Sequence, residues 1–451
     1  MNDHSFQHLQ RGGLAMMNHN SMRSTAKHPG VLSAAIFLLG WTAGSVAASA
    51  QQAPPLSRVD LDQAIQLALA HNHALKAAQT LVPQSQAEEI TAAIRPNPVF
   101  TYDDLYVPIF SPSQLNSTTL DNITEFDLGV SYTFERGHKR QARMQAARDQ
   151  TAQTRSQVND TERGLRSNVA QQFIGVLLAK ANLQLANADL ASFQQTVHLS
   201  QERFRAGAIG EGDLLKIKLQ LLQFQMDVSS ARLALVQALA SLRQLLGFES
   251  VPIDYDVTGE LAYTPLGLNQ EDLQLRALKL RPDLLAAQQG VTAAQSQFQL
   301  AKANGKRNLT TTLDYTHVSA LNSASFTMNI EIPIFDRNQG EIARTHYAVS
   351  QAQETSSAAS ETVMTDVANA YQGVETSARV VELYTSGYLK QAEDSRDISE
   401  YAYKRGAASL LDFLDAERSY RATQLAYRQA LANYMLATET LRQAVGTRNL
   451  S

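Results

Sequence analysis

The sequence has 451 residues, of which 44% are hydrophobic, a formal net charge of −4 and no cysteine. Without cysteine there can be no disulfide framework, zinc–thiolate site, thiol nucleophile, iron–sulfur cluster or acylated lipoprotein cysteine. The slightly acidic balance argues against nucleic acid as a partner, because no basic stripe is available to neutralise phosphates. The low contents of glycine (22) and proline (12) favour helices.

The first 50 residues have the features of a secretory signal peptide. Arg23 and Lys27 precede a short apolar run at 31–39, and a stretch of small residues then ends with Ala48 and Ala50. This pattern predicts cleavage before Gln51, which leaves a short mature N-terminal segment at 51–57. An uncleaved membrane anchor is the alternative, but the apolar run is too short to span a bilayer.

The rest of the chain reads as two copies of one unit. Residues 203–247 align without a gap with 402–446, and 11 of the 45 pairs are identical. Two further matches keep the same order upstream, since 134–143 resembles 335–344 and 68–79 resembles 277–288. Three matches in one order predict an internal duplication with a period of about 200 residues.

Each copy is expected to contain a first helix, a β-hairpin, a very long helix, a tip turn and a return helix. No proline lies between Ser113 and Val251 or after Pro333, so both long helices are predicted to be unbroken. The predicted boundaries are 58–250 for the first copy (hairpin 98–135, tip turn near 207), 251–269 for a linker, 270–447 for the second copy (hairpin 308–335, tip turn near 406) and 448–451 for a tail.

Two segments alternate between apolar and polar residues over ten positions, at 125–134 and at 326–335. This length and this period are typical of transmembrane β-strands. A soluble sheet packed on helices would give the same pattern in any single strand, and this alternative stays open. Because four strands cannot close a barrel, the membrane interpretation requires an oligomer.

At this point the chain resembles the TolC-type outer-membrane efflux and secretion duct family. The resemblance covers 58–447 and rests on Pro96-Asn97-Pro98, on RPDLLAAQ at 281–288, on PIFDRNQGEIAR at 333–344 and on the two tip turns. FERGHKRQAR at 134–143 and PIFDRNQGEIAR are most similar to the heavy-metal, CzcC-type branch. The resemblance implies a mainly α fold with a transmembrane β portion, in which a trimer forms a 12-stranded β-barrel and a periplasmic α-barrel.

The same resemblance implies a function and a set of partners. We expect a homotrimer that acts as the passive exit duct of a tripartite efflux system and conducts cargo, with metal cations as a candidate cargo, across the periplasm and the outer membrane. The expected partners are a periplasmic adaptor (membrane fusion) protein, an inner-membrane pump of RND or ABC type, and outer-membrane lipid. Neither a cofactor nor a catalytic centre is expected.

The candidate functional residues lie at the two tip turns. The turns carry Phe204 and Gly207 in the first copy and Arg405 and Gly406 in the second, and the resemblance implies that the adaptor docks on them. Glycine there also permits the left-handed backbone that a tight turn between helices needs, a role that does not exclude docking.

The candidate gate residues are carboxylates close to the second tip turn. Asp412 and Asp415 are three residues apart on one helix face, so a trimer would stack them in two rings that favour cations. They match the constricting aspartates of the family; solvated acids at a helix N-terminus are the alternative. Asp213 and Tyr403 match a family latch in which a phenol hydrogen-bonds a carboxylate, although Ala408 stands where the family has an arginine.

Other functions find little support in the sequence. Phosphate-binding glycine loops, G-x-S-x-G and H-E-x-x-H are absent, which argues against an enzyme. His71 and His73 are two residues apart on a helix and point to different sides, so they make no metal site. The remaining alternative to a duct is a secreted periplasmic structural coiled-coil protein that never enters a membrane.

Overall fold

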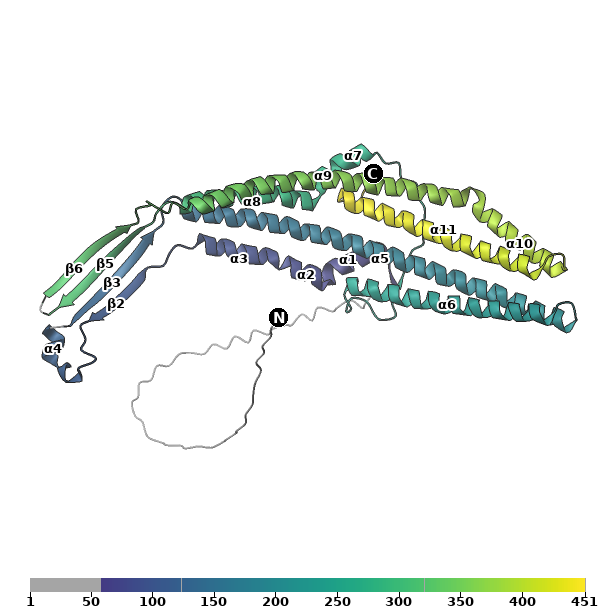
Figure 1. Cartoon of the computed structure of the whole chain (residues 1–451), viewed down its shortest axis with the longest axis horizontal. Helices are drawn as coiled ribbons and strands as arrows, with labels where there is room; N and C mark the ends of the chain where they lie inside the picture. Colours follow the sequence, from purple (N-terminus) through teal and green to yellow (C-terminus); the bar gives the residue numbers. More distant parts are fainter. Residues whose placement is uncertain (1–57, 123, 320, 451) are drawn as a thin grey trace, which may run out of the picture. The chain divides into compact units, whose positions relative to one another are not determined.

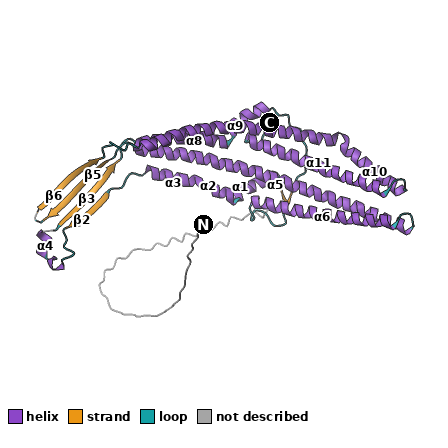
Figure 2. Cartoon of the chain, viewed as in Figure 1, coloured by secondary structure: helices purple, strands orange, loops and turns teal. Residues whose placement is uncertain are grey.

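The computed structural model describes residues 58–122, 124–319 and 321–450. The predicted signal peptide, the cleavage site with Ala48, Ala50 and Gln51, and the segment 51–57 lie outside these described residues. The described chain is mainly helical and contains one four-stranded sheet (Figure 1; Figure 2). In the described ranges no helix is both long and apolar enough to cross a bilayer.

The first copy begins with short helices and ends with a long helical hairpin. The predicted first helix is broken at Asn72, whose Oδ1 accepts from the N–H of Leu75 (3.0 Å) and whose Nδ2 donates to the carbonyl of Leu245 (3.0 Å). Asn72 thereby caps a new helix and ties it to the end of the return helix. The elements are β1 (Arg58–Val59), α1 (Leu61–His71), α2 (His73–Gln79), α3 (Leu81–Ala93), β2 (Val99–Leu105), a 3₁₀ turn (Pro112–Gln114), α4 (Ser117–Asn122), β3 (Glu125–Phe134), α5 (Lys139–Arg205) and α6 (Glu211–Leu246).

The second copy repeats this order after the short strand β4 (Asp256–Val257), which pairs in parallel with β1. Pro282 stands at the start of α8 and separates it from α7, because proline is tolerated only in the first turn of a helix. The elements are α7 (Gln270–Leu280), α8 (Pro282–Asn304), β5 (Leu309–Val318), β6 (Leu321–Ile330), α9 (Gln339–Leu383), a π-helical turn (Tyr384–Tyr388), α10 (Leu389–Arg405) and α11 (Leu410–Val445).

The prediction of an unbroken long helix is right for the first copy and wrong for the second. Helix α5 has 67 residues, which corresponds to roughly 100 Å at 1.5 Å per residue. The matching helix of the second copy is interrupted between α9 and α10 by the π-helical turn, where Gly387 has a φ of 141° and a ψ of −19°. L side chains rarely adopt this backbone conformation, so a glycine interrupts the helix where no proline does.

The four long strands form one antiparallel sheet in the order β2-β3-β5-β6. Strand β3 coincides with the predicted segment 125–134, but β6 lies at Leu321–Ile330 rather than at 326–335. A tight turn at Ser319, with a φ of 55°, pairs Val318 with Leu321 and so starts β6 early. The strand ends before Pro333, which has no N–H to donate to a neighbour.

Helix α5 is the common partner of the helical part. It packs against α6, α8, α3 and α11, and α9 packs against α8 and α11. Three separate apolar cores result, one around Phe173 near α1, one around Val363 where α7, α9 and α11 meet, and one around Phe224 near the tip turns. The last of these cores positions the candidate gate residues.

Candidate functional site at the tip turns

The two tip turns have the same backbone structure. Gly207 and Gly406 both adopt a left-handed conformation, with φ of 74° and 77°. In both turns the N–H of the residue after the glycine donates to a carbonyl of the preceding helix, over 2.8 Å at Ala208 and 2.8 Å at Ala407. This is the usual way to end a helix with a glycine, and here it has been preserved through the duplication.

Arg203 joins one tip turn to the other. Its Nη1 donates to the backbone carbonyl of Tyr403 over 2.9 Å, and its guanidinium lies 5.0 Å from the centre of the Tyr403 ring. The sequence analysis missed this residue, because its partner in the duplication is Ala402 and only a tertiary contact reveals its role. Arg203 therefore holds the end of α10 against the end of α5.

Tyr403 is buried between the two helical hairpins rather than hydrogen-bonded to a carboxylate. Its ring stacks on Phe413, with centroids 5.4 Å apart, and only 4% of the residue is exposed. Its hydroxyl has no hydrogen-bond partner among the residues that the structure describes. Asp213 instead faces Lys216 of its own helix, with 3.4 Å between Oδ1 and Nζ. Within one chain the structure therefore does not bring the two predicted latch residues together.

Asp412 serves as the third residue of a capping box at the start of α11. Its Oδ2 accepts from the hydroxyl (2.7 Å) and from the N–H (3.2 Å) of Ser409, whose hydroxyl accepts from the Asp412 N–H (3.2 Å). Asp213 holds the matching position of α6, but the cap there is Gly210, which offers no side chain. Asp412 thus stabilises its own helix terminus, as the alternative reading held, while its side chain remains exposed.

The other predicted tip residues lie at the surface. Asp415 pairs with Arg418 of its own helix over 3.5 Å, and both side chains are largely exposed. Arg405 lies over the ring of Tyr401 at 5.3 Å, and Phe204 is 38% exposed. These side chains are accessible to a second molecule.

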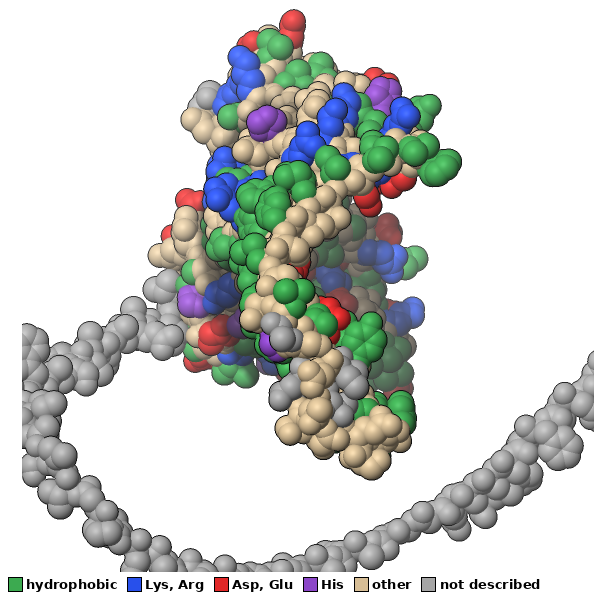
Figure 3. Space-filling view, turned by 90° about the vertical axis from the view of Figure 1, so that its left-hand side faces the viewer, with side chains coloured by type: hydrophobic (Ala, Val, Ile, Leu, Met, Phe, Trp, Pro, Cys, Tyr) green, Lys and Arg blue, Asp and Glu red, His purple; other side chains and the backbone are tan. Residues whose placement is uncertain are grey.

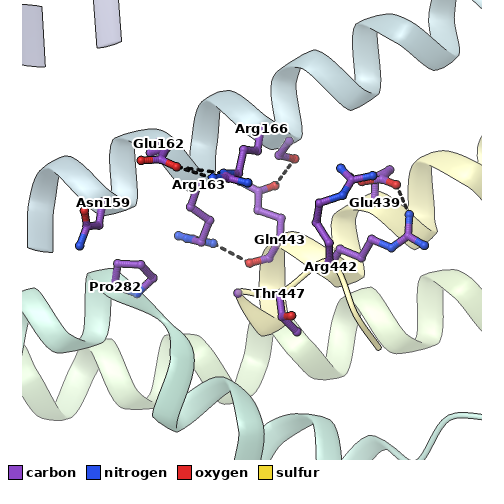
Figure 4. A pocket seen from close by; sticks show the side chains of 12 residues that line it. Asn159, Glu162, Arg163, Arg166, Pro282, Glu439, Arg442, Gln443 and Thr447 are labelled. Atoms are coloured by element: carbon purple, nitrogen blue, oxygen red, sulfur yellow. Dashed lines mark hydrogen bonds and ion pairs between the residues drawn. The ribbon is translucent and has the colours of Figure 1, made fainter. Parts of the chain in front are cut away.

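A cavity of about 470 Å³ lies away from the tip turns, where α5 meets the C-terminal end of α11 (Figure 4). The arginines that line it are paired: Arg163 donates to the carbonyl of Gln443 over 2.7 Å, Arg442 bonds to Glu439, and Arg166 bonds to Glu162. No group of three metal-ligating side chains occurs in the described parts of the chain. The cavity is therefore a structural junction and offers no catalytic arrangement.

Comparisons with known proteins point to one family. The family model described as "Outer membrane efflux protein" matches residues 64–248 and 274–447. The cobalt-zinc-cadmium resistance protein CzcC of Cupriavidus metallidurans is 24% identical over 390 residues, covering 86% of this chain and 90% of CzcC. The outer membrane protein TolC of Vibrio cholerae is 23% identical over 318 residues, covering 67% of this chain and 72% of TolC.

Solved structures show the same fold. A crystal structure of CusC superposes with a TM-score of 0.71 at 22% identity and covers 88% of this chain and 96% of CusC. The open state of the Neisseria gonorrhoeae MtrE outer membrane channel gives a TM-score of 0.70 at 19% identity, with coverage of 86% and 89%. The expected duct fold is confirmed. The chain therefore belongs to the outer membrane efflux protein family, as its motifs predicted, and is an export channel of the outer membrane with a periplasmic helical part rather than an enzyme.

Proposed function

We propose that three copies of this chain form the exit duct of a tripartite export system, which docks on a periplasmic adaptor served by an inner-membrane pump of RND or ABC type. The two repeats, 58–250 and 270–447, are the building units of that duct. The observation that carries the proposal is that the sheet has two edges without a ladder partner in the described chain, and that both outer helices carry exposed apolar side chains.

The sheet has one apolar and one polar face. Phe126, Leu128 and Val130 of β3 share a face with Tyr315 and Leu313 of β5, because these residues pair in register. Large apolar side chains of the strands are exposed, and hydrophobic side chains lie at the surface of the end that Figure 3 turns towards the viewer. Such a face suits lipid, and the polar face then suits a water-filled lumen.

The sheet also has two unpaired edges. Strand β2 is one edge and β6 is the other, and each presents a row of backbone groups without a ladder partner in the described chain. In a bilayer these groups cannot bond to water, so a spanning sheet must close on itself. Pairing of β2 with β6 of a neighbouring chain would satisfy both edges, and three chains with four strands each would contribute twelve strands.

The helices offer a matching pair of edges. Within one chain α6 packs on α5, α5 on α11, and α11 on α9 and α10, so α6 and α9–α10 are the outer helices. Helix α6 carries an apolar stripe in which each residue is more than half exposed: Leu215, Leu219, Leu222, Met226, Leu233 and Val236. Helices α9 and α10 and the turn between them carry a second exposed stripe: Val380, Leu383, Tyr388, Ile398 and Tyr401.

The internal duplication indicates how these stripes meet. Helix α11 corresponds to α6, and α5 corresponds to α9–α10, so the internal contact between α5 and α11 has a counterpart between α10 and α6. That counterpart can form only between two copies, since α6 and α10 lie at opposite edges of one chain. A head-to-tail contact of this kind generates a closed ring when its rotation closes.

The polar face of the sheet supports cations as cargo. Asp103 pairs with Asp127, Asp314 pairs with Gly129, and Glu125 lies two residues before Asp127, so four carboxylates lie on that face. Asp104 lies on the other face, opposite Phe126, and the four strands contain no lysine or arginine. A lumen lined in this way favours cations. CzcC is named for cobalt, zinc and cadmium resistance and CusC for cation efflux, so we extend the proposal to metal cations as a cargo class.

The tip turns complete the proposal. Exposed Asp412 and Asp415 would form two carboxylate rings at the periplasmic entrance, and Phe204, Gly207, Arg405 and Gly406 would form the adaptor surface. We also retain Asp213 and Tyr403 as gate residues. Tyr403 would then act through the packing of its ring, because its hydroxyl is buried and unpartnered.

Site-specific photo-crosslinking tests the assembly. A photoreactive phenylalanine analogue at Leu222 lies in the proposed contact, whereas one at Lys216 lies about 120° round the same helix on an exposed position outside the stripe. We expect irradiation of the Leu222 variant in membranes to give products of two and three chains, and the Lys216 variant to give few. Products that stop at two chains, or equal yields from both positions, would contradict the ring.

A further inference from the structure

A buried ion cluster joins the two helical hairpins above the tip turns. Arg421 of α11 reaches Asp189 of α5, with 3.3 Å between Nε and Oδ2, and its Nη2 bonds to Asp227 of α6. The side chains of Arg421 and Asp189 are only 17% and 9% exposed. One guanidinium thus binds two carboxylates of the other hairpin, an arrangement that a planar, five-donor group favours.

An aromatic pair supports this cluster from below. The Arg421 guanidinium lies 4.3 Å from the centre of the Phe224 ring, and Phe224 stacks on Phe193 with 4.6 Å between centroids. Phe193 and Phe224 belong to the same apolar core as Tyr403 and Phe413. The ion cluster and the tip core are therefore one continuous contact between the hairpins.

The duplication does not repeat this cluster. The residue that corresponds to Arg421 in the first copy is Leu222, and Asp227 corresponds to Ala426. Leu222 lies on the exposed stripe of α6. The same helix position therefore carries an arginine in the contact within one chain and a leucine in the proposed contact between two chains. The ion cluster therefore distinguishes the two kinds of hairpin contact.

One of the two helices of the hairpin that Arg421 holds is interrupted, whereas α11 continues unbroken. The π-helical turn at Tyr384–Tyr388 interrupts the helix there, and a cavity of about 470 Å³ lies beside it. This cavity is lined by Tyr384, Tyr388 and Gln391 on one side and by Thr423 of α11 on the other. Tyr384 contacts Tyr427 of α11, with ring centroids 6.0 Å apart, and the cavity next to this contact leaves room for α10 to bend about Gly387.

We propose that Arg421 is a positioning residue of the channel: it clamps the α10–α11 hairpin, which carries Asp412 and Asp415, to the α5–α6 hairpin, and its release lets that hairpin swing about Gly387 and widen the periplasmic entrance. The clamp rests on the proposed function, because it acts on the gate of that duct. It adds a control point about three helical turns into α11, whereas the residues considered so far lie at the tip itself.

Single-channel recording in planar bilayers tests the clamp. Loss of a charged hydrogen-bond pair of this kind corresponds to about a tenfold change in an equilibrium. We therefore expect Arg421→Gln to raise the open fraction about tenfold, and Asp227→Asn, which removes one arm, to raise it less. Arg421→Lys keeps the charge but can satisfy fewer acceptors, so it should restore part of the closed fraction.

Arg344→Gln is the matched control. Arg344 lies near the start of α9, where it forms an exposed ion pair with Glu341 of the same helix. We expect this variant to conduct like the parent chain, and all variants to show the parent's native mass in detergent. An unchanged open fraction in Arg421→Gln, or an equal rise in Arg344→Gln, would overturn the clamp. A parent chain that forms no channels would instead contradict the proposed duct.

Discussion

Tyr403 and Phe413 lie face to face at the tip, with ring planes only 7° apart, although one belongs to the helix that enters the turn and the other to the helix that leaves it. The guanidinium of Arg203, from the other hairpin, lies over the Tyr403 ring and donates to the Tyr403 carbonyl. The tip is therefore held by stacked side chains and by one arginine–carbonyl bond. Hydrogen bonding by the phenol contributes nothing to it within the described chain.

This arrangement predicts that Tyr403→Phe is nearly neutral. The variant removes a buried hydroxyl that has no partner, so the free energy of unfolding should stay the same or rise slightly. The open fraction in planar bilayers should also be unchanged. Phe413→Ala is the comparison, since the loss of a buried aromatic ring should cost about 3–5 kcal/mol. A marked rise in opening for Tyr403→Phe would show that its hydroxyl does form a latch.

The two roles of Asp412 can be separated by the choice of substitution. Asp412→Asn combined with Asp415→Asn removes the charge but keeps a side chain that can cap the helix, so it should weaken cation preference without changing the unfolding temperature. Asp412→Ala with Asp415→Ala should also weaken cation preference and raise pore leak. Ser409 still caps the helix in this variant, so the loss of the Asp412 half of the capping box should cost at most about 1 kcal/mol of stability. Unchanged selectivity and conductance in planar bilayers would remove both residues from the gate.

Arg281 explains the RPDLLAAQ motif in structural terms. Its side chain is 4% exposed and pairs with Asp283 (2.5 Å) and with Asp366 of α9 (2.8 Å), while its Nη1 also donates to the carbonyl of Ala444. Arg281→Met would leave Asp366 unpaired and Asp283 with only its longer contact to Arg163 (3.7 Å), so we expect it to reduce the free energy of unfolding by about 2–3 kcal/mol.

Denaturant unfolding measures this effect. Arg344→Gln is the control, because Arg344 forms an exposed ion pair with Glu341 within one helix, and a solvent-screened pair of this kind should contribute little to the free energy of unfolding. Similar losses for Arg281→Met and Arg344→Gln would show that the buried cluster has no special role.

Acid should favour the clamped arrangement at Arg421. Burial raises the pKa of Asp189 above its ordinary value and outweighs the lowering effect of Arg421, Arg428 and Arg396. The clamped state therefore binds this proton more tightly than a state in which Asp189 faces water, and opening becomes easier as the pH rises through the raised pKa. The pKa of Glu417, packed in the same region, is likewise raised by burial, with Arg396 lowering it and Asp189 and Glu400 raising it, so its sign is the same.

The open fraction measured as a function of pH checks this sign. Asp189→Asn mimics the protonated carboxyl and leaves the bond between Asp227 and Arg421 in place. We therefore expect this variant to keep the low open fraction of acid conditions at higher pH and to depend less on pH. An open fraction that falls as the pH rises would mean that the charge of Asp189 strengthens the clamp instead.

Local patterns in the sequence were sufficient for much of the fold. Strand β3 was predicted at its observed bounds because a two-residue period over ten positions leaves little freedom of register. Strand β6 was misplaced, because the apolar alternation continues through Ile332 and Ile334 after the pairing has ended. The break at Gly387 was missed because a glycine within a helical pattern is usually tolerated, and only the structure shows its left-handed backbone.

The candidate functional residues also fall into two groups, those with a local signal in the sequence and those that only tertiary contacts reveal. The duplication aligns the tip glycines and Asp412, and the structure confirms only their local roles in the turns and in the capping box, while their roles in docking and gating stay predictions. Arg203 and Arg421 were not predicted, because each contacts the helical hairpin of the other repeat within the same chain. A contact between residues so far apart in the sequence leaves no signal in the local spacing of residues. Asp213 was matched to Tyr403, but the burial of the Tyr403 ring against Phe413 keeps its hydroxyl away from that carboxylate.

The native mass of the protein extracted from outer membranes in detergent tests the central claim most directly. The account predicts three chains, because the edges β2 and β6 and the outer helices α6 and α9–α10 can all be paired only in a closed ring. A monomer or a dimer, recovered from the periplasmic fraction without membrane extraction, would contradict the duct and leave a helical protein that never closes a barrel.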